Sequence, residues 1–214
     1  MRELWMKRHV LLLGLILGTQ VWAHPVAYKG AFSFMALNQK DMLDWQLLYS
    51  FERNLSFGLD FIHDTMEGPD RYFLIPRLSW LVHRWNEKDS QANIYVYGGA
   101  GVGKMDLGYR TAAEGALEAD YETREIYFSG KATVVAAKDF KTLDVYQLRA
   151  GFAPYVGEFD SLHSWLIGQV QYVPSSNDEQ WRVGPVVRLF YRNVLTELGV
   201  SAKGSWNINF MVHW

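Results

Sequence analysis

The sequence predicts an all-β protein that folds as a single antiparallel transmembrane β-barrel. Apolar and polar residues alternate with a period of two over most of the chain, and turn-forming segments separate the alternating stretches. Aromatic residues stand at the ends of the apolar rows, as they do at the two interfaces of a membrane-spanning barrel. We expect ten to twelve strands, with eight as an alternative.

The first residues have the pattern of a secretory signal peptide. Lys7 and Arg8 precede an apolar run at 10–18, and Val21 and Ala23 place residues of limited size three and one before a cleavage point. The apolar run is much shorter than the ~20 residues that a helix needs to cross a bilayer. We therefore expect residues 1–23 to be a signal peptide cleaved between Ala23 and His24, and residues 24–214 to form the barrel. A retained N-terminal anchor is the alternative.

The composition excludes several classes of protein. The chain has no cysteine, so it has no disulfide, no thiolate metal site and no lipidated N-terminal cysteine. It has 21 basic and 23 acidic residues, a net charge of −2 and no basic block, so we expect no nucleic-acid partner. Aromatic residues are abundant, with nine Trp, twelve Tyr and twelve Phe.

Eleven stretches of the chain fit β-strands. Four alternate regularly: 43–51, 55–62, 181–191 and 206–214. The less regular candidates are 30–37, 71–85, 92–103, 124–137, 142–155, 162–173 and 194–202. A closed barrel with both ends on one side needs an even number of strands, so either one candidate is spurious or 104–123 contains a twelfth strand.

The segment 104–123 is otherwise the longest connection, and long connections of such barrels face outside the cell. It contains the best helical stretch of the sequence, Thr111–Asp120, which is short. We also expect that the strand 71–85 bends at Pro76.

Alternation alone does not say which face points outward, because a soluble barrel with an apolar interior alternates as well. The row from Trp181 to Tyr191 would extend about 33 Å. Tilted by ~40°, it covers about 25 Å of the membrane normal, which is the height of the apolar band of an outer-membrane barrel. We expect five aromatics at the lipid interface: Trp45, Trp181, Tyr191, Trp206 and Trp214. Seven polar residues of opposite parity are expected to face the lumen: Asp44, Gln46, Asp60, Arg182, Arg188, Asn207 and Asn209.

Two motifs carry a family resemblance. The final stretch Trp206–Trp214, WNINFMVHW, resembles the C-terminal signal of bacterial outer-membrane barrels. The stretch Ile94–Gly103, IYVYGGAGVG, resembles the glycine-rich strand of small barrels of the OmpA-transmembrane and OmpW-like type. The resemblance implies a Gram-negative outer membrane, contact with its lipids, and recognition of the C-terminal strand by the barrel-assembly machinery.

The segment Gly98–Lys104, GGAGVGK, has the spacing of a phosphate-binding loop. Met105 stands where a Ser or Thr would bind magnesium, so the nucleotide reading fails at that position. We interpret the glycines as strand residues whose missing side chains leave room for bulky neighbours or for a tight curve.

His24 is a candidate metal ligand. Once it is the first residue, its α-amine and imidazole would form a chelate that suits Cu(II). The alternative is a terminal histidine with no metal role. We predict no other cofactor.

The sequence favours a non-enzymatic, porin-like role, either narrow transport or a structural or surface role. Arg182, Arg188, Asp44 and Asp60 could form a salt-bridged plug or line a small polar pore. The first alternative is a membrane-embedded hydrolase that modifies lipids. No catalytic residue is assigned to it, because the neighbours His163 and Ser164 point to opposite faces of a strand. The second alternative is a soluble periplasmic barrel that binds an apolar ligand.

Overall fold

The computed structural model describes residues 26–66, 68–106, 108–157 and 161–214. These residues form twelve strands, and they contain no helix long and apolar enough to cross a membrane. The strands are β1 (Phe32–Gln39), β2 (Met42–Glu52), β3 (Leu55–Asp64), β4 (Arg71–Asn86), β5 (Ser90–Met105), β6 (Gly108–Thr123), β7 (Ile126–Ala137), β8 (Leu143–Phe152), β9 (His163–Tyr172), β10 (Trp181–Tyr191), β11 (Val194–Val200) and β12 (Trp206–His213).

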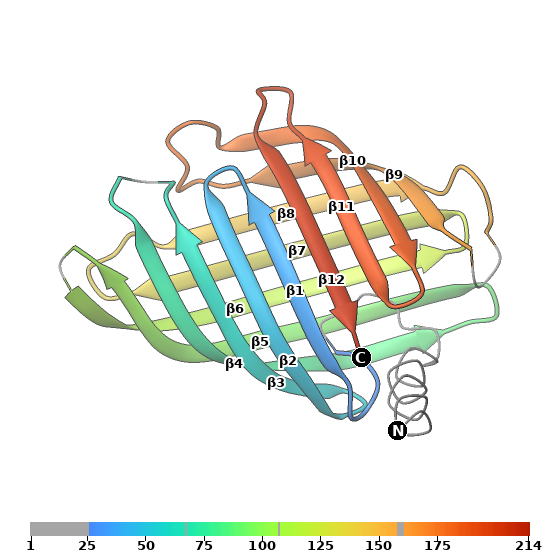
Figure 1. The fold of residues 1–214 in the computed structure, drawn as a ribbon, viewed down its shortest axis with the longest axis horizontal. Helices are drawn as coiled ribbons and strands as arrows, with labels where there is room; N and C mark the ends of the chain where they lie inside the picture. Colours follow the sequence, from blue (N-terminus) through green and yellow to red (C-terminus); the bar gives the residue numbers. More distant parts are fainter. Residues whose placement is uncertain (1–25, 67, 107, 158–160) are drawn as a thin grey trace, which may run out of the picture.

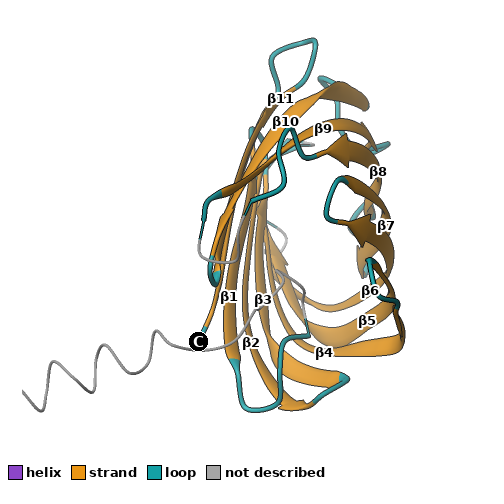
Figure 2. Ribbon diagram, turned by 90° about the vertical axis from the view of Figure 1, so that its right-hand side faces the viewer, coloured by secondary structure: helices purple, strands orange, loops and turns teal. Residues whose placement is uncertain are grey.

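The twelve strands form one closed antiparallel barrel (Figure 1). Each strand pairs with its sequence neighbours, and β1 pairs with β12 to close the sheet, with Phe34 opposite Val212. The strand number lies within the expected ten to twelve, and the alternative of eight is wrong. Figure 2 shows that the barrel has an elongated cross-section, with β1–β3 on one side and β6–β8 on the other.

The segment 104–123 contains the twelfth strand, β6, so the prediction that it is the longest connection is wrong. The whole of β6 pairs with β5, from Ser90 opposite Thr123 to Met105 opposite Gly108. Backbone pairing on both edges thus overrides the local helical preference of its Ala and Glu residues.

The beginning of β1 and the end of β12 lie at the same end of the barrel, because the strand number is even. We call this the terminus end. It also carries the connections 53–54, 87–89, 124–125, 153–162 and 192–193. The opposite, distal end carries 40–41, 65–70, 106–107, 138–142, 173–180 and 201–205.

The two faces of the sheet differ in chemistry. Large apolar side chains point outward on every strand, among them Leu47 at 50%, Phe57 at 54% and Leu148 at 67% exposed. The inward face carries buried polar residues such as Gln46 and Asp60. This arrangement is the reverse of a soluble barrel with an apolar interior, and it places apolar surface where lipid would be.

The glycines of β5 allow a close approach to β4. A Cβ atom at Gly99 would overlap the carbonyl oxygen of Pro76, and one at Gly101 would overlap that of Leu74. The glycine-rich stretch Ile94–Gly103 is part of one continuous strand, β5. β4 also runs through Pro76, and its register irregularity lies further on, between Leu81 and His83.

Candidate functional site

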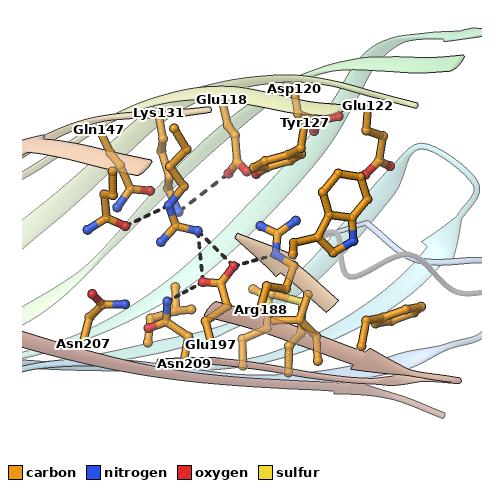
Figure 3. Close-up of a pocket in the computed structure, with 18 of the residues that line it drawn as sticks. Glu118, Asp120, Glu122, Tyr127, Lys131, Gln147, Arg188, Glu197, Asn207 and Asn209 are labelled. Carbon is orange, nitrogen blue, oxygen red and sulfur yellow. Dashed lines mark hydrogen bonds and ion pairs between the residues drawn. The ribbon is translucent and has the colours of Figure 1, made fainter. Parts of the chain in front are cut away.

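The barrel encloses a cavity of about 860 Å³ (Figure 3). Its described lining carries eight carboxylates and six Lys or Arg side chains. The exposed turn residues Glu87, Lys88 and Asp89, together with Arg124 and Arg192, belong to this lining, so the cavity reaches the terminus end of the barrel.

Glu197 of β11 is the centre of one charged network within the cavity. Its carboxylate accepts hydrogen bonds from Arg149 Nη1 at 3.0 Å, Arg188 Nε at 2.7 Å and Asn209 Nδ2 at 2.8 Å. The register places Arg188, Glu197 and Asn209 side by side on three neighbouring strands, all facing inward. The Arg188 guanidinium also lies 4.2 Å from the ring centroid of Tyr127. We call these five residues the Glu197 network; Figure 3 labels four of them, Tyr127, Arg188, Glu197 and Asn209.

Arg77 of β4 is the centre of a second network. It is 2% exposed, and it donates to Asp60 at 2.8 Å, to Glu114 at 3.2 Å and to Gln46. Gln46 in turn donates to Asp44 at 2.9 Å. This Arg77 network ties β2, β3, β4 and β6 together through buried charge.

A row of inward carboxylates continues along β6 toward the terminus end. Glu118 accepts a hydrogen bond from Tyr97 Oη at 2.9 Å and lies 3.7 Å from Lys131 Nζ. Asp120 accepts from Asn93 at 2.7 Å. Figure 3 shows Glu118, Asp120 and Glu122 on one wall, opposite Glu197 and Asn209.

An apolar cluster closes the interior near the distal end. Its buried members include Met42, Ile62, Phe73, Leu143 and Val173. No described residue of the distal connections lines the cavity. Within the part of the chain that the structure describes, the cavity reaches the terminus end, and on the distal side its lining stops at strand-end residues such as Gln39, Met42 and Leu143.

The connection 173–180 covers the distal end next to this cluster. Its Asn177 N–H donates to the carbonyl of Met66 at 3.4 Å. Behind it, Arg182 donates to Asp41 at 2.9 Å and to Gln39 at 2.9 Å. The exposed pair Lys40–Asp178 lies nearby, at 3.3 Å. The Arg182–Asp41 ion pair, which is little exposed, thus ties the start of β10 to the β1–β2 connection.

The residues expected in the lumen all lie on the inward face, but not in one group. Gln46, Asp60, Arg182, Asn207 and Asn209 are buried, and Asp44 and Arg188 are partly buried. Asp44, Gln46 and Asp60 belong to the Arg77 network, and Arg188 and Asn209 belong to the Glu197 network. Arg182 sits apart at the distal end. Arg182 pairs with Asp41 and Arg188 with Glu197, so these four residues do not form a salt-bridged plug among themselves.

The five aromatics expected at an interface point outward and are 40–60% exposed. Trp45, Trp181 and Trp206 lie toward the distal ends of their strands, whereas Tyr191 and Trp214 lie at the terminus end. The backbone N–H and C=O of Trp214 each pair with Phe32, so the last residue is part of the barrel closure.

Five central charged residues were missed by the sequence reasoning: Arg77, Glu114, Glu118, Arg149 and Glu197. Their parity gave a usable signal. Glu114, Glu118, Asp120 and Glu122 occupy even positions of β6, and the odd positions between them carry no charge: Gly115, Leu117, Ala119 and Tyr121. Treating 104–123 as a connection concealed this alternation.

A serine and a histidine, the residue types of a catalytic pair, meet between β1 and β12. A cross-strand pair exists, with Ser33 Oγ 2.6 Å from His213 Nδ1. However, these residues are 0% and 1% exposed, and neither lines the cavity. His163 and Ser164 are neighbours on β9, as expected, and only His163 lines the cavity.

The proposed copper ligand His24 lies outside the described residues. Within the described ranges, no group of three or more His, Asp or Glu side chains is arranged to hold a metal ion.

No family model and no curated protein matches the chain. Among solved structures, the KdgM porin in complex with disordered oligogalacturonate has a TM-score of 0.48 and 8% identity, covering 86% of this chain and 98% of that one. The KdgM porin alone has a TM-score of 0.47 with the same identity and coverage. In-vitro folded OmpT, an outer-membrane protein of Vibrio cholerae, has a TM-score of 0.32 and 7% identity over 92% of this chain and 100% of that one. At these values the likeness carries no functional argument, and the resemblance to OmpA-transmembrane and OmpW-like barrels stays a prediction.

Proposed function

We propose that the chain is an outer-membrane β-barrel that provides a narrow route for small polar solutes. The observation that carries this proposal is the charge-lined cavity of about 860 Å³ inside a barrel whose outward face is apolar on every strand. A polar lumen within an apolar belt is the arrangement by which such barrels take polar solutes through lipid.

Location and assembly are part of the same proposal. Outward aromatics near both ends of the barrel would lie at the two lipid–water interfaces, where indole and phenol rings are favoured. The signal peptide 1–23 would direct export. The C-terminal strand, which ends at Trp214, would be the segment that the barrel-assembly machinery binds.

The distal closure makes this route conditional. A solute that enters from the terminus end meets the apolar cluster and the connection 173–180. Conduction therefore requires this connection to move. Arg182 opposes that movement, because it donates to the Glu179 carbonyl and to Ser176 Oγ, both at 3.2 Å, while its pair with Asp41 holds it in place.

Planar-bilayer conductance of the purified protein tests the proposal. We expect small single-channel currents, and we expect Arg182→Met and Asp41→Asn each to increase the open time, because both remove the tie. Lys40→Met is the matched control, since its pair with Asp178 is exposed and contributes little. Folding of every variant is checked by heat-modifiable gel mobility. Absence of current in the wild type and in both folded distal variants would refute transport.

The apolar cluster favours one other role, that of a closed structural barrel. Its buried side chains come from β2, β3, β4, β6, β7 and β8, and they seal the interior as a protein core does. This role predicts that the distal variants lose stability and never conduct.

A further inference from the structure

We propose that the distal half of the cavity binds an uncharged, hydroxyl-rich solute of the sugar or polyol class through a cluster of carboxamide side chains. This inference rests on the proposed function and deepens it, because it names the solute class that the route would admit. The carboxamide cluster consists of Gln147, Gln169, Gln171, Asn207 and Asn209, all of which line the cavity.

Two members of the cluster are held in place by charged groups. Gln169 accepts a hydrogen bond from Arg149 at 2.9 Å, and Asn209 donates to Glu197 at 2.8 Å. Their positions are thus fixed by the Glu197 network, whose members lie on strands from β7 to β12. Figure 3 shows Gln147 on one wall of the cavity, with Asn207 and Asn209 on the opposite wall.

The other three members are left for a ligand. Among the described residues, no side-chain hydrogen-bond partner is found for Gln147, Gln171 or Asn207. Asn207 is 9% exposed with its Nδ2 unsatisfied, and Gln171 is 2% exposed. A buried carboxamide N–H without a partner is unfavourable, so Asn207 favours a polar molecule in the cavity, and Gln147 and Gln171 can contact the same molecule.

Two inward glycines lie between β9 and β12, where neighbouring groups pack closely against them. Gly184 of β10 and Gly199 of β11 lie between the glutamines and the asparagines around the barrel. A Cβ atom at Gly199 would overlap Asn207 Oδ1, so the asparagine side chain occupies the position above this glycine. Gln169, Gln171 and Asn207 also line one small recess next to the cavity.

The chemistry of the cluster matches hydroxyl groups. A carboxamide offers an acceptor and two donors side by side, and neighbouring hydroxyls of a polyol can both give and accept hydrogen bonds. The nearby charges are already paired: Arg149 with Glu197 at 3.0 Å, and Lys131 with Glu118 at 3.7 Å. A charged solute would have to displace such a pair, whereas an uncharged one only adds hydrogen bonds. A cavity of about 860 Å³ is within the range of small-molecule sites.

Binding of sucrose to the processed full chain in detergent micelles tests this inference. We expect saturable binding, measured by saturation-transfer NMR and calorimetry. Gln171→Leu and Asn207→Leu should each weaken it roughly two- to tenfold, the loss expected for one hydrogen bond. Gln180→Leu is the matched control, because Gln180 is exposed in the connection 173–180 and lies outside the cavity lining.

Competition defines the preference for an uncharged ligand. Sorbitol should displace sucrose from the wild type more effectively than gluconate, an anion of similar size. No saturable sucrose binding, equal binding by all three variants, or tighter competition by gluconate would each overturn the inference. Ion conductance without sucrose binding would remove the sugar site and leave transport standing. Sucrose binding without any conductance, including in the distal variants, would refute transport and leave the sugar site standing.

Discussion

At the scale of single residues, buried charge organises the interior. Arg77 is 2% exposed and has carboxylates on two sides, Asp60 at 2.8 Å and Glu114 at 3.2 Å. A buried guanidinium is stabilised by the carboxylates next to it, and each of these buried carboxylates is stabilised by the guanidinium. The network therefore links β2, β3, β4 and β6 on the inner face of one part of the barrel wall.

Replacing Arg77 by Met should lower the free energy of unfolding by about 3–5 kcal/mol, because it leaves two buried carboxylates without their cation. The measurement is urea titration of the protein folded in lipid vesicles. Arg110→Met is the control, since its pair with Asp139 is partly exposed and contributes at most about 1 kcal/mol. Equal stability of the two variants would show that the Arg77 network does not hold the barrel.

Sequence parity predicted which polar residues point inward, but not which of them meet. Arg182 and Arg188 share a parity on β10, yet Arg182 pairs with Asp41 and Arg188 with Glu197. Which inward residues form ion pairs depends on the stagger between strands and on how far apart the strands lie around the barrel. The sequence of a single strand gives neither of these quantities. Arg77 was missed for a related reason: its strand was treated as less regular.

At the scale of elements, the β4–β5 pair shows why one strand is rich in glycine. The backbones approach so closely around Pro76 that Gly99 and Gly101 have no room for a side chain. The sequence interpretation was room for bulky neighbours or a tight curve; the geometry shows instead a close approach of two backbones. The adjacent β6 was the least predictable strand, because its Ala and Glu residues favour helix locally and only pairing with β5 and β7 makes it extended.

Gly99→Ala should destabilise the barrel by about 1–3 kcal/mol, because the new Cβ must push β4 and β5 apart. Gly115→Ala is the matched control on β6, where a Cβ would meet nothing within 4 Å. There we expect no loss, or a gain of up to about 1 kcal/mol from the less flexible unfolded chain. Guanidinium unfolding in detergent micelles compares the two, and a larger loss for Gly115→Ala would contradict the close-approach explanation.

At the scale of the whole molecule, alternation and the even-strand rule were enough to predict a single antiparallel barrel. Alternation and strand number did not predict the apolar cluster near the distal end. Met42, Ile62, Phe73 and Leu143 come from four different strands, and they form one cluster only because the barrel brings their distal ends together. A one-ended cavity is a property of the closed barrel, not of any segment.

The central claim is that the apolar face meets lipid and the polar face surrounds the cavity. Leu148 and Gln147 are neighbours in the middle of β8: Leu148 points outward and is 67% exposed, whereas Gln147 lines the cavity. An arginine facing lipid at the bilayer centre costs about 2–4 kcal/mol, while one in a polar lumen remains solvated.

The most direct measurement is urea titration of Leu148→Arg and Gln147→Arg, each folded into phosphatidylcholine vesicles. We predict that Leu148→Arg loses about 2–4 kcal/mol relative to the wild type and that Gln147→Arg loses clearly less. The opposite order, with the cavity-facing arginine the more costly, would show that the outward face does not lie in lipid.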